Sequence, residues 1–401
     1  MDELAHRWSE LLLADRTLDD MPATRAAREA QSLLREPAWE NEIAAAEERL
    51  GCRLPPSFRE FLLVSDGAYG DLYGANSTFS EDGWEVARED STVIGVGFLP
   101  VADLRWLREA HPQAAEIYRV AGARPERVPA AVDGAELQSW TAFADGVKIA
   151  VNMEPGLTCL VPFDGIEEWQ VWNIHFETCV GFLSFRSMLE YHVAEREPIT
   201  QMEEFEEILL WASAGDHRAV RRLFHTTTPE AVPKLVALVD DRSLARAAAA
   251  ALGRIGTPES VEALAQMEPG QSSAALAMAG TDRARDLLAQ HGDYHWLSLL
   301  GDPRGPQLAA DRLASRSASD TVWSLSAALG ALARSRDERF VPLVLPLLSE
   351  EPQLALRAAG TLAWLGAPQG RARIVSLAGE AGPARAGAQN MLRILDAGHL
   401  P

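Results

Sequence analysis

The sequence predicts an α+β domain, in which an antiparallel-rich sheet is flanked by helices, followed by an all-α helical repeat domain. Three observations predict this division. In residues 39–70, apolar residues recur at helical spacing in two short segments separated by a sharp turn. Turn dipeptides recur between residues 128 and 182. After Pro198 no strand pattern is found. Mixed periodicities followed by helical periodicity alone are typical of two separate units. We expect an N-terminal helical arm at 1–37, the α+β domain at 38–197 and the helical repeats at 198–401.

The composition indicates a globular intracellular protein. The chain has 401 residues, of which 47% are hydrophobic, enough for two or three domains with cores of their own. Asp2 and Glu3 stand where a secretory signal carries basic residues, and no apolar run approaches the length of a membrane span. Cys52, Cys159 and Cys179 are widely spaced and offer no disulfide framework. We therefore expect a cytoplasmic protein without membrane contact.

The negative charge is concentrated in the first half of the chain. The whole chain has 58 Asp+Glu and 37 Lys+Arg, and residues 1–200 contain 35 and 17 of them, which leaves 23 and 20 for the rest. The net charges of the halves are thus −18 and −3. Such an N-terminal half repels nucleic acid and favours basic partners. The alternative is that the acidity only aids solubility.

The corner at residues 39–67 joins two short predicted helices. One apolar stripe is formed by Trp39, Ile43, Ala46 and Leu50, and Gly51 follows as a helix-ending glycine. Leu54 is expected to point inward, and Pro55 and Pro56 open the next helix, where a missing N–H costs nothing. The stripe of this second helix is Phe58, Phe61 and Leu62, and Asp66-Gly67 ends it.

This stretch resembles the signature of the SUKH superfamily. The resemblance is carried by Ile43, Glu47, Leu50, Gly51, Leu54, Pro55, Phe58, Phe61, Leu62, Asp66 and Gly67. A second familial pattern is carried by Leu99, Pro100, Val101, Leu104 and Trp106. The resemblance spans roughly residues 37–196 and implies a packing core that includes the residues of both patterns together with Trp39.

The remaining elements of the first domain follow the order expected of such a fold. A strand is predicted at 92–99 and a helix from Asp103 to Ala110. A meander is predicted from four turn dipeptides, Asp133-Gly134, Asp145-Gly146, Pro155-Gly156 and Asp164-Gly165. We assign Trp172 to the core, leave the role of Trp169 open, and expect a closing helix that Ser184 caps.

The segment after Pro198 is rich in Ala, Leu, Arg and Gly and contains an internal repeat. Residues 245–264 resemble a bacterial HEAT-like unit, and residues 357–377 repeat the pattern. The leucines that anchor successive units are Leu252, Leu276, Leu297, Leu329, Leu362 and Leu392. The last three intervals are close to thirty residues, as stacked helix pairs require, whereas the first two are compressed.

No motif of catalysis or cofactor binding stands out. A phosphate loop and a Gly-x-Ser-x-Gly elbow are both missing from the sequence. His291 and His295 lack the glutamate of a zinc hydrolase helix and are interpreted as surface histidines. His175 and Cys179 are interpreted as a pair on one strand face, in the core or at an edge. We therefore predict no catalytic residue, no metal, no cofactor and no enzyme activity.

The best candidate for function is the acidic segment from Asp66 to Asp90, which also contains aromatic residues. Aromatic anchors among charges are typical of protein interfaces. The predicted partner-binding residues are Asp66, Tyr69, Asp71, Tyr73, Glu81, Asp82, Trp84 and Glu85. The alternative is a solvated loop whose aromatic residues cap the sheet.

The resemblance implies a protein-binding function. Bacterial SUKH proteins are immunity proteins that bind and block a cognate toxin, often a basic nuclease, so we expect a protein partner and no nucleic acid. The alternative, based on fungal members, is a regulatory adaptor that binds one protein with the SUKH-like domain and another with the helical repeats.

Overall fold

The computed structural model describes residues 1–14, 30–68, 98–112, 115–116, 141–151, 157–163, 166–174, 179–317, 320 and 322–396. The chain divides into two compact units, Met1–Ala194 and Glu195–Pro401. The predicted strand at 92–99 and the turns at 133–134, 155–156 and 164–165 lie wholly or largely outside the described residues.

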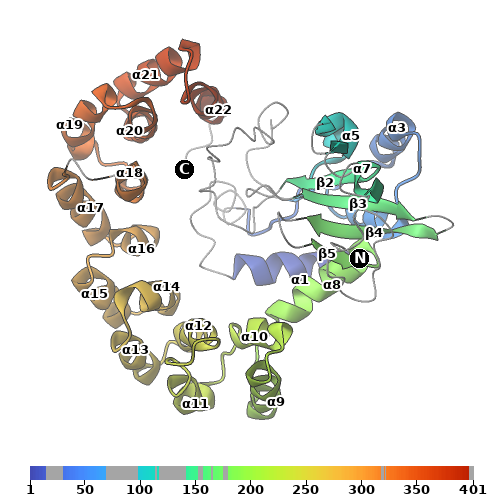
Figure 1. Cartoon of the computed structure of the whole chain (residues 1–401), viewed down its shortest axis with the longest axis horizontal. Coiled ribbons are helices and arrows are strands. Elements are labelled where there is room, and N and C mark those ends of the chain that lie inside the picture. The colour runs from blue at the N-terminus through green and yellow to red at the C-terminus, as the bar shows by residue number, and fades with distance from the viewer. Residues whose placement is uncertain are drawn as a thin grey trace. The chain divides into compact units, whose positions relative to one another are not determined.

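The first unit is an antiparallel sheet with helices, as predicted (Figure 1). Its strands follow one another in the order β1-β2-β3-β4-β5, and each pair is antiparallel. The strands are β1 (Arg105–Trp106), β2 (Val147–Val151), β3 (Leu157–Phe163), β4 (Ile166–Ile174) and β5 (Cys179–Phe182). The helices are α1 (Asp2–Leu13), α3 (Glu40–Leu50), α4 (Pro56–Leu62), η2 (Val101–Asp103), α5 (Leu107–Ala110), α7 (Thr141–Ala144) and α8 (Phe185–Arg196).

Alternation along the strands gives the sheet two buried faces. Leu160 and Val171 belong to the larger core, which also contains Trp8 and Leu12 of the N-terminal helix. Cys159 and Trp172 face the other way, into a smaller core. Trp172 is therefore a core residue, as predicted, and the N-terminal helix packs on the first unit.

Four phenylalanines form the centre of the larger core. Phe58 and Phe61 lie on α4, Phe185 opens α8, and Phe98 precedes the second familial pattern. The ring centroids of the pairs in contact, which are all pairs except Phe58 with Phe98, lie between 4.9 and 6.2 Å apart. The signature helix therefore stabilises the domain mainly by burying large aromatic side chains.

The helix predicted from Asp103 to Ala110 is wrong in part. Val101–Asp103 form a 3-10 turn, and Arg105 and Trp106 form the edge strand β1 before α5 begins at Leu107. The strand forms because Arg105 and Trp106 pair with Lys148 and Val147 of β2. A partner about forty residues away, rather than the local pattern, decides this conformation.

The second unit consists of helices among its described residues and forms an arc (Figure 1). The inner layer contains α10 (His217–Leu223), α12 (Ala245–Ile255), α14 (Pro269–Ala279), α16 (Tyr294–Leu299), α18 (Val322–Ser335), α20 (Pro352–Trp364) and α22 (Arg385–Asp396). The outer layer contains α9 (Met202–Ser213), α11 (Val232–Val236), α13 (Pro258–Ala265), α15 (Asp282–Gln290), α17 (Arg304–Ala314), α19 (Val341–Val344) and α21 (Pro368–Gly379). Short 3-10 turns are η4 (Pro229–Ala231), η5 (Glu338–Phe340) and η6 (Leu345–Ser349).

The predicted repeat corresponds to this alternation. Each of the six anchor leucines lies on a different inner helix, from Leu252 on α12 to Leu392 on α22. Successive inner helices contact one another, so the leucines contribute to one continuous stack. The first intervals are compressed because the intervening outer helices α13 and α15 have only 8 and 9 residues.

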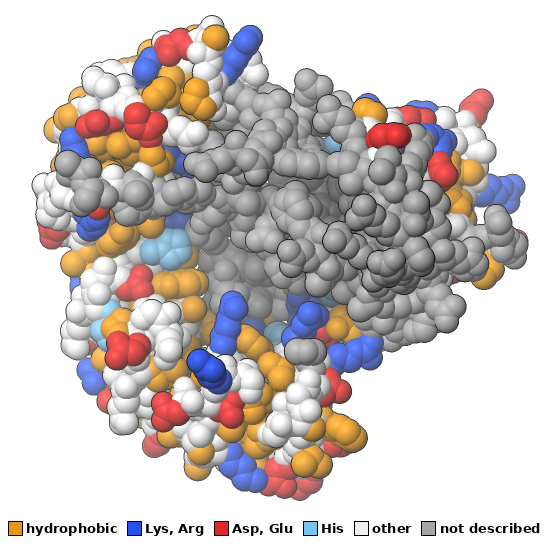
Figure 2. Space-filling model, viewed as in Figure 1, with side chains coloured by type: hydrophobic (Ala, Val, Ile, Leu, Met, Phe, Trp, Pro, Cys, Tyr) orange, Lys and Arg blue, Asp and Glu red, His pale blue; other side chains and the backbone are white. Residues whose placement is uncertain are grey.

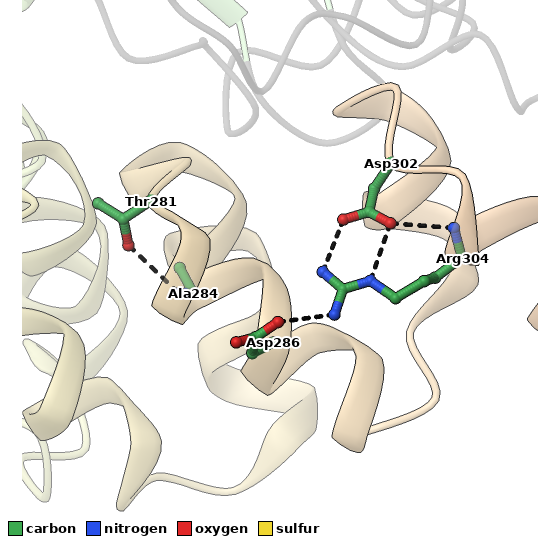
Figure 3. Close-up of polar contacts among 5 residues, drawn as sticks. All are labelled: Thr281, Ala284, Asp286, Asp302 and Arg304. Carbon is green, nitrogen blue, oxygen red and sulfur yellow. Dashed lines mark hydrogen bonds and ion pairs between the residues drawn. The ribbon is translucent and has the colours of Figure 1, made fainter.

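An ion network joins the outer helix α15 to the turn before α17 (Figure 3). The Asp302 carboxylate accepts hydrogen bonds from the backbone N–H and the guanidinium of Arg304, at 2.7 to 2.9 Å. Arg304 also contacts Asp286 of α15 at 2.7 Å. The hydrogen bonds from Arg304 lower the pKa of Asp302, which is buried. Arg304 thereby connects the turn before α17 to the neighbouring outer helix.

Candidate functional site

The two familial patterns meet and support the start of the segment predicted to bind a partner. Trp106 Nε1 donates to the Leu50 carbonyl at 3.0 Å. Gly51, the residue after Leu50, ends α3 with φ +70°, a left-handed conformation that favours glycine. Leu54 is buried and its N–H donates to Glu47 Oε1 at 3.0 Å. The aliphatic and phenylalanine residues of both patterns are buried, as a packing core requires, whereas Gly51 is exposed and Trp106 is half-buried.

Asp66 is the one predicted contact residue that the structure describes. The Val101 N–H donates to its Oδ1 at 2.6 Å, and its own N–H donates to the Glu36 carbonyl at 2.9 Å. Burial raises the pKa of Asp66 although the Val101 hydrogen bond acts in the opposite direction. These contacts give Asp66 an internal role at the base of the segment. The remaining predicted contacts lie outside the described residues: Tyr69, Asp71, Tyr73, Glu81, Asp82, Trp84 and Glu85.

Trp39 corrects the sequence prediction, because it is 75% exposed rather than part of the core. It is the N-cap of α3 and its backbone is extended, with φ −76° and ψ 147°. A residue outside the first helical turn does not share the direction of the helical stripe. Ala38, one residue earlier, is buried instead.

Trp39 belongs to an exposed stretch of apolar and acidic residues, in which Glu40 is paired with Arg59. Leu63, at the end of α4, is 43% exposed, and the Ala38 N–H donates to the Leu62 carbonyl at 2.9 Å, so the backbone before Trp39 lies against the end of α4. Exposed glutamates precede and follow Trp39 in the chain. We call this the Trp39 surface and define it as Glu36, Pro37, Trp39, Glu40, Glu42 and Leu63.

A hollow opens beside the Trp39 surface. It has a volume of about 650 Å³, and Glu36, Pro37 and Leu63 contribute to its wall, together with residues of α1. A large exposed aromatic side chain beside a concavity, with acids around it, has the features of an interface anchor region. This arrangement can bind a partner that offers apolar and basic side chains together.

Sequence reasoning missed this surface, although one signal for it was present. Glu42 lies three residues after Trp39, and its Oε2 accepts the Trp39 N–H at 2.8 Å. A glutamate at this spacing is typical of the third position of a helix whose N-cap is three residues earlier. Applied to Trp39, the rule places the indole outside the helix.

The described residues offer little for catalysis. They contain no group of three or more His, Cys, Asp and Glu side chains placed to hold a metal ion. Burial raises the pKa of the Cys159 thiol to about 12, so it is not a nucleophile at neutral pH. His291 follows α15 and His295 lies on α16, which separates the pair between two helices.

The interpretation of His175 and Cys179 as neighbours on one strand is wrong. The strand β4 ends at Ile174, and Cys179 begins β5, where it is the register partner of Ile174. His175 itself lies outside the described residues. None of the described helices combines the length and the apolar character needed to cross a membrane.

Comparison with known families identifies modules in both units. An α+β unit followed by a helical solenoid is an arrangement of two modules that is typical of proteins that bind other proteins. Residues 37–191 match the model of the SMI1 / KNR4 family (SUKH-1), and residues 244–267 match the PBS lyase HEAT-like repeat. No curated protein matches the chain. Both resemblances seen in the sequence are thereby confirmed, and both modules are typical of protein–protein interaction.

Proposed function

We propose that the protein is a bacterial immunity protein whose N-terminal unit binds a basic toxin and blocks it by occlusion. It acts in the cytoplasm and catalyses no reaction. The observation that carries the proposal is the exposed Trp39, which lies among glutamates in the half of the chain whose net charge is −18. Charge complementarity speeds association and selects the partner, whereas a buried aromatic anchor supplies much of the binding energy.

Growth rescue by co-expression tests this proposal. The toxin for the assay is the product of the gene beside this one, expressed in a bacterial host whose growth it arrests. The wild-type chain restores growth, and we expect Trp39→Ala to abolish the rescue at equal protein level. Trp211→Ala is the matched control, since Trp211 is 54% exposed on α9 of the other unit, and it should restore growth fully.

Two results would contradict the proposal. A neighbouring gene product that does not arrest growth, or is not bound by the wild-type chain, would remove the immunity function. Equal rescue by both tryptophan variants would keep the function but move the contact away from the Trp39 surface.

The second candidate function is a regulatory adaptor that binds two different proteins. It is favoured by the size of the second unit, since blocking a toxin requires only one binding domain. The solenoid has continuous hydrophobic cores of its own and a long inner layer of helices. Such layers are widely used as extended binding surfaces.

A further inference from the structure

The helix α9 exposes large apolar side chains at the beginning of the solenoid. It is the first helix that lies wholly within the second unit, and it packs on α10 and η4. Leu210 is 68% exposed and Trp211 is 54% exposed. Figure 2 shows hydrophobic and acidic side chains next to one another where Figure 1 places α9. Terminal helices of a solenoid normally present a polar outer face to water, so an apolar pair at this position indicates a binding surface.

The exposed residues of α9 lie on one side of the helix. They follow one another at the i, i+4, i+7, i+8 spacing of a single helix face. We call this side the α9 face and define it as Glu203, Glu207, Leu210 and Trp211. On the opposite side of α9, Phe205 and Ala212 are buried in the core of the second unit. The α9 face therefore points away from that core.

Ion pairs flank the α9 face but do not include its own acids. The Glu204 carboxylate pairs with Arg222 of α10, and the Glu206 carboxylate pairs with Lys234 of α11. Because successive residues of a helix are about 100° apart around its axis, these two glutamates lie on opposite sides of the α9 face. Within the described residues, the two glutamates of the α9 face itself form no ion pair. Their charges are therefore available to a partner.

We propose that the α9 face binds an amphipathic helix of a second partner protein, whose first half is apolar and whose second half is basic on the contacting side. In an antiparallel arrangement, the apolar half packs on Leu210 and Trp211 and the basic half reaches Glu203 and Glu207. Basic residues near the end of the partner helix also complement its own dipole. This inference rests on the adaptor function, which it deepens, and the toxin takes no part in it.

A second copy of this chain fits the α9 face less well than a basic helix does. The helix α9 contains four glutamates and no basic residue. If two copies of α9 packed antiparallel, the acids of each copy would lie against Leu210 and Trp211 of the other. If they packed parallel, the acids would face one another. Burying a carboxylate without a partner is costly, so the acids of the α9 face favour a basic partner.

Fluorescence anisotropy with a labelled peptide tests the proposal on the full chain. The probe is an alanine-based helix of about 18 residues, with two leucines in its first half and two lysines in its second half on the same face. A second peptide of equal composition carries its lysines on the opposite face and should bind more weakly. We expect Trp211→Ala to weaken binding of the probe about tenfold, as loss of an aromatic anchor predicts. Glu203→Gln with Glu207→Gln should weaken it about threefold and reduce its salt dependence.

The matched control is Trp39→Ala, which removes an exposed tryptophan beside acids from the other unit. It should change binding of the probe less than about twofold, since distant sites act independently. Circular dichroism confirms that each variant is folded. If Trp211→Ala unfolds the chain, Leu210→Gln, at a more exposed position, should weaken binding about fivefold.

The proposal is overturned if the wild-type chain does not bind the probe, if both peptides bind equally, or if the two tryptophan variants weaken binding equally. Self-association that Trp211→Ala abolishes in the ultracentrifuge would assign the α9 face to a second copy. Loss of growth rescue in Trp211→Ala would assign it to the toxin. A chain that fails the peptide test and still restores growth loses only this inference, whereas one that binds the peptide without restoring growth loses only the immunity function.

Discussion

The two units bury their hydrophobic surface in opposite ways. The first unit centres its core on large rings, in which Phe61 and Phe185 each contact the other three of the set Phe58, Phe61, Phe98 and Phe185. The solenoid fills its cores largely with alanine and leucine, and its helices approach closely at glycine and alanine. The first unit should therefore be sensitive to loss of volume, and the second to added volume.

The largest effect is expected for Phe61→Ala in the first unit. Phe61 is fully buried, and its ring centroid lies 4.9 Å from that of Phe185 and 5.4 Å from that of Phe98. Truncation of a buried phenylalanine costs about 3–5 kcal/mol through lost transfer energy and the cavity left behind. Differential scanning calorimetry should show the transition of the first unit at a much lower temperature. A parallel shift of the solenoid transition would contradict the independence of the two cores.

A smaller but clear effect is expected for Gly253→Ala on α12. A Cβ atom at Gly253 would lie 2.3 Å from the carbonyl oxygen of Ala275 on α14, which is backbone and cannot rotate away. Forcing a methyl group into such a contact costs about 1–3 kcal/mol. Urea unfolding followed by helical circular dichroism measures the loss.

Gly270→Ala is the control for this substitution. Gly270 lies on the neighbouring inner helix α14, and nothing lies within 4 Å of a Cβ atom placed there. The same chemical change should leave stability unchanged or raise it slightly, since alanine favours helix. If both variants are equally stable, close approach of small residues is not what limits this layer.

Loss of the Arg304 network should destabilise the solenoid less than Gly253→Ala does. Arg304→Gln removes the guanidinium from Asp302, but the backbone N–H of residue 304 still donates to the buried carboxylate, and the space left by the 43% exposed Arg304 side chain lets water reach it. Arg283→Gln, which breaks the exposed contact with Glu262, serves as control and should change the unfolding temperature little. Equal shifts in both variants would assign no special role to the network.

The pH dependence of this network has a definite sign. The pKa of Asp302 is lowered in the folded state, so the ion pair contributes stability above the ordinary pKa of the carboxyl group. That contribution is lost as the pH falls through the lowered value. In acid titrations the wild-type solenoid should therefore lose stability more steeply than the Arg304→Gln variant. Parallel curves would contradict the assignment.

The smallest effect on stability is expected for Trp39→Ala. An exposed side chain contributes little to folding, and its replacement should change the free energy of unfolding by no more than about 0.5 kcal/mol. Thermal unfolding of the first unit measures this change in the free energy of unfolding. A loss comparable to that of Phe61→Ala would mean that Trp39 belongs to the core after all.

Local patterning predicted the parts of the fold that depend on local interactions. The helix-ending Gly51, the inward Leu54 and the six anchor leucines are placed as expected because capping and helical spacing decide them. The edge strand at Arg105 and Trp106 was missed because its pairing partner is distant in the sequence. The residue pattern of a short segment does not reveal a strand partner that is distant in the sequence.

The candidate site was predicted less well than the fold. Trp39 stands four residues before Ile43, which is the spacing of residues on one helix face, although it lies one position before the helix begins. For this reason Trp39 was assigned to the core. The capping interaction with Glu42 distinguishes the two positions.

Titration calorimetry with the product of the neighbouring gene, which we propose to be the toxin, tests the central claim most directly. The chain carrying Glu36→Lys and Glu42→Lys, beside Trp39, is compared with one carrying Glu203→Lys and Glu207→Lys, at exposed positions of α9. If the first unit recognises a basic partner through the Trp39 surface, the first pair should raise Kd at least about tenfold, because like charges then face each other. The second pair should leave Kd within about twofold. Equal Kd values for both variants and the wild-type chain would contradict the account.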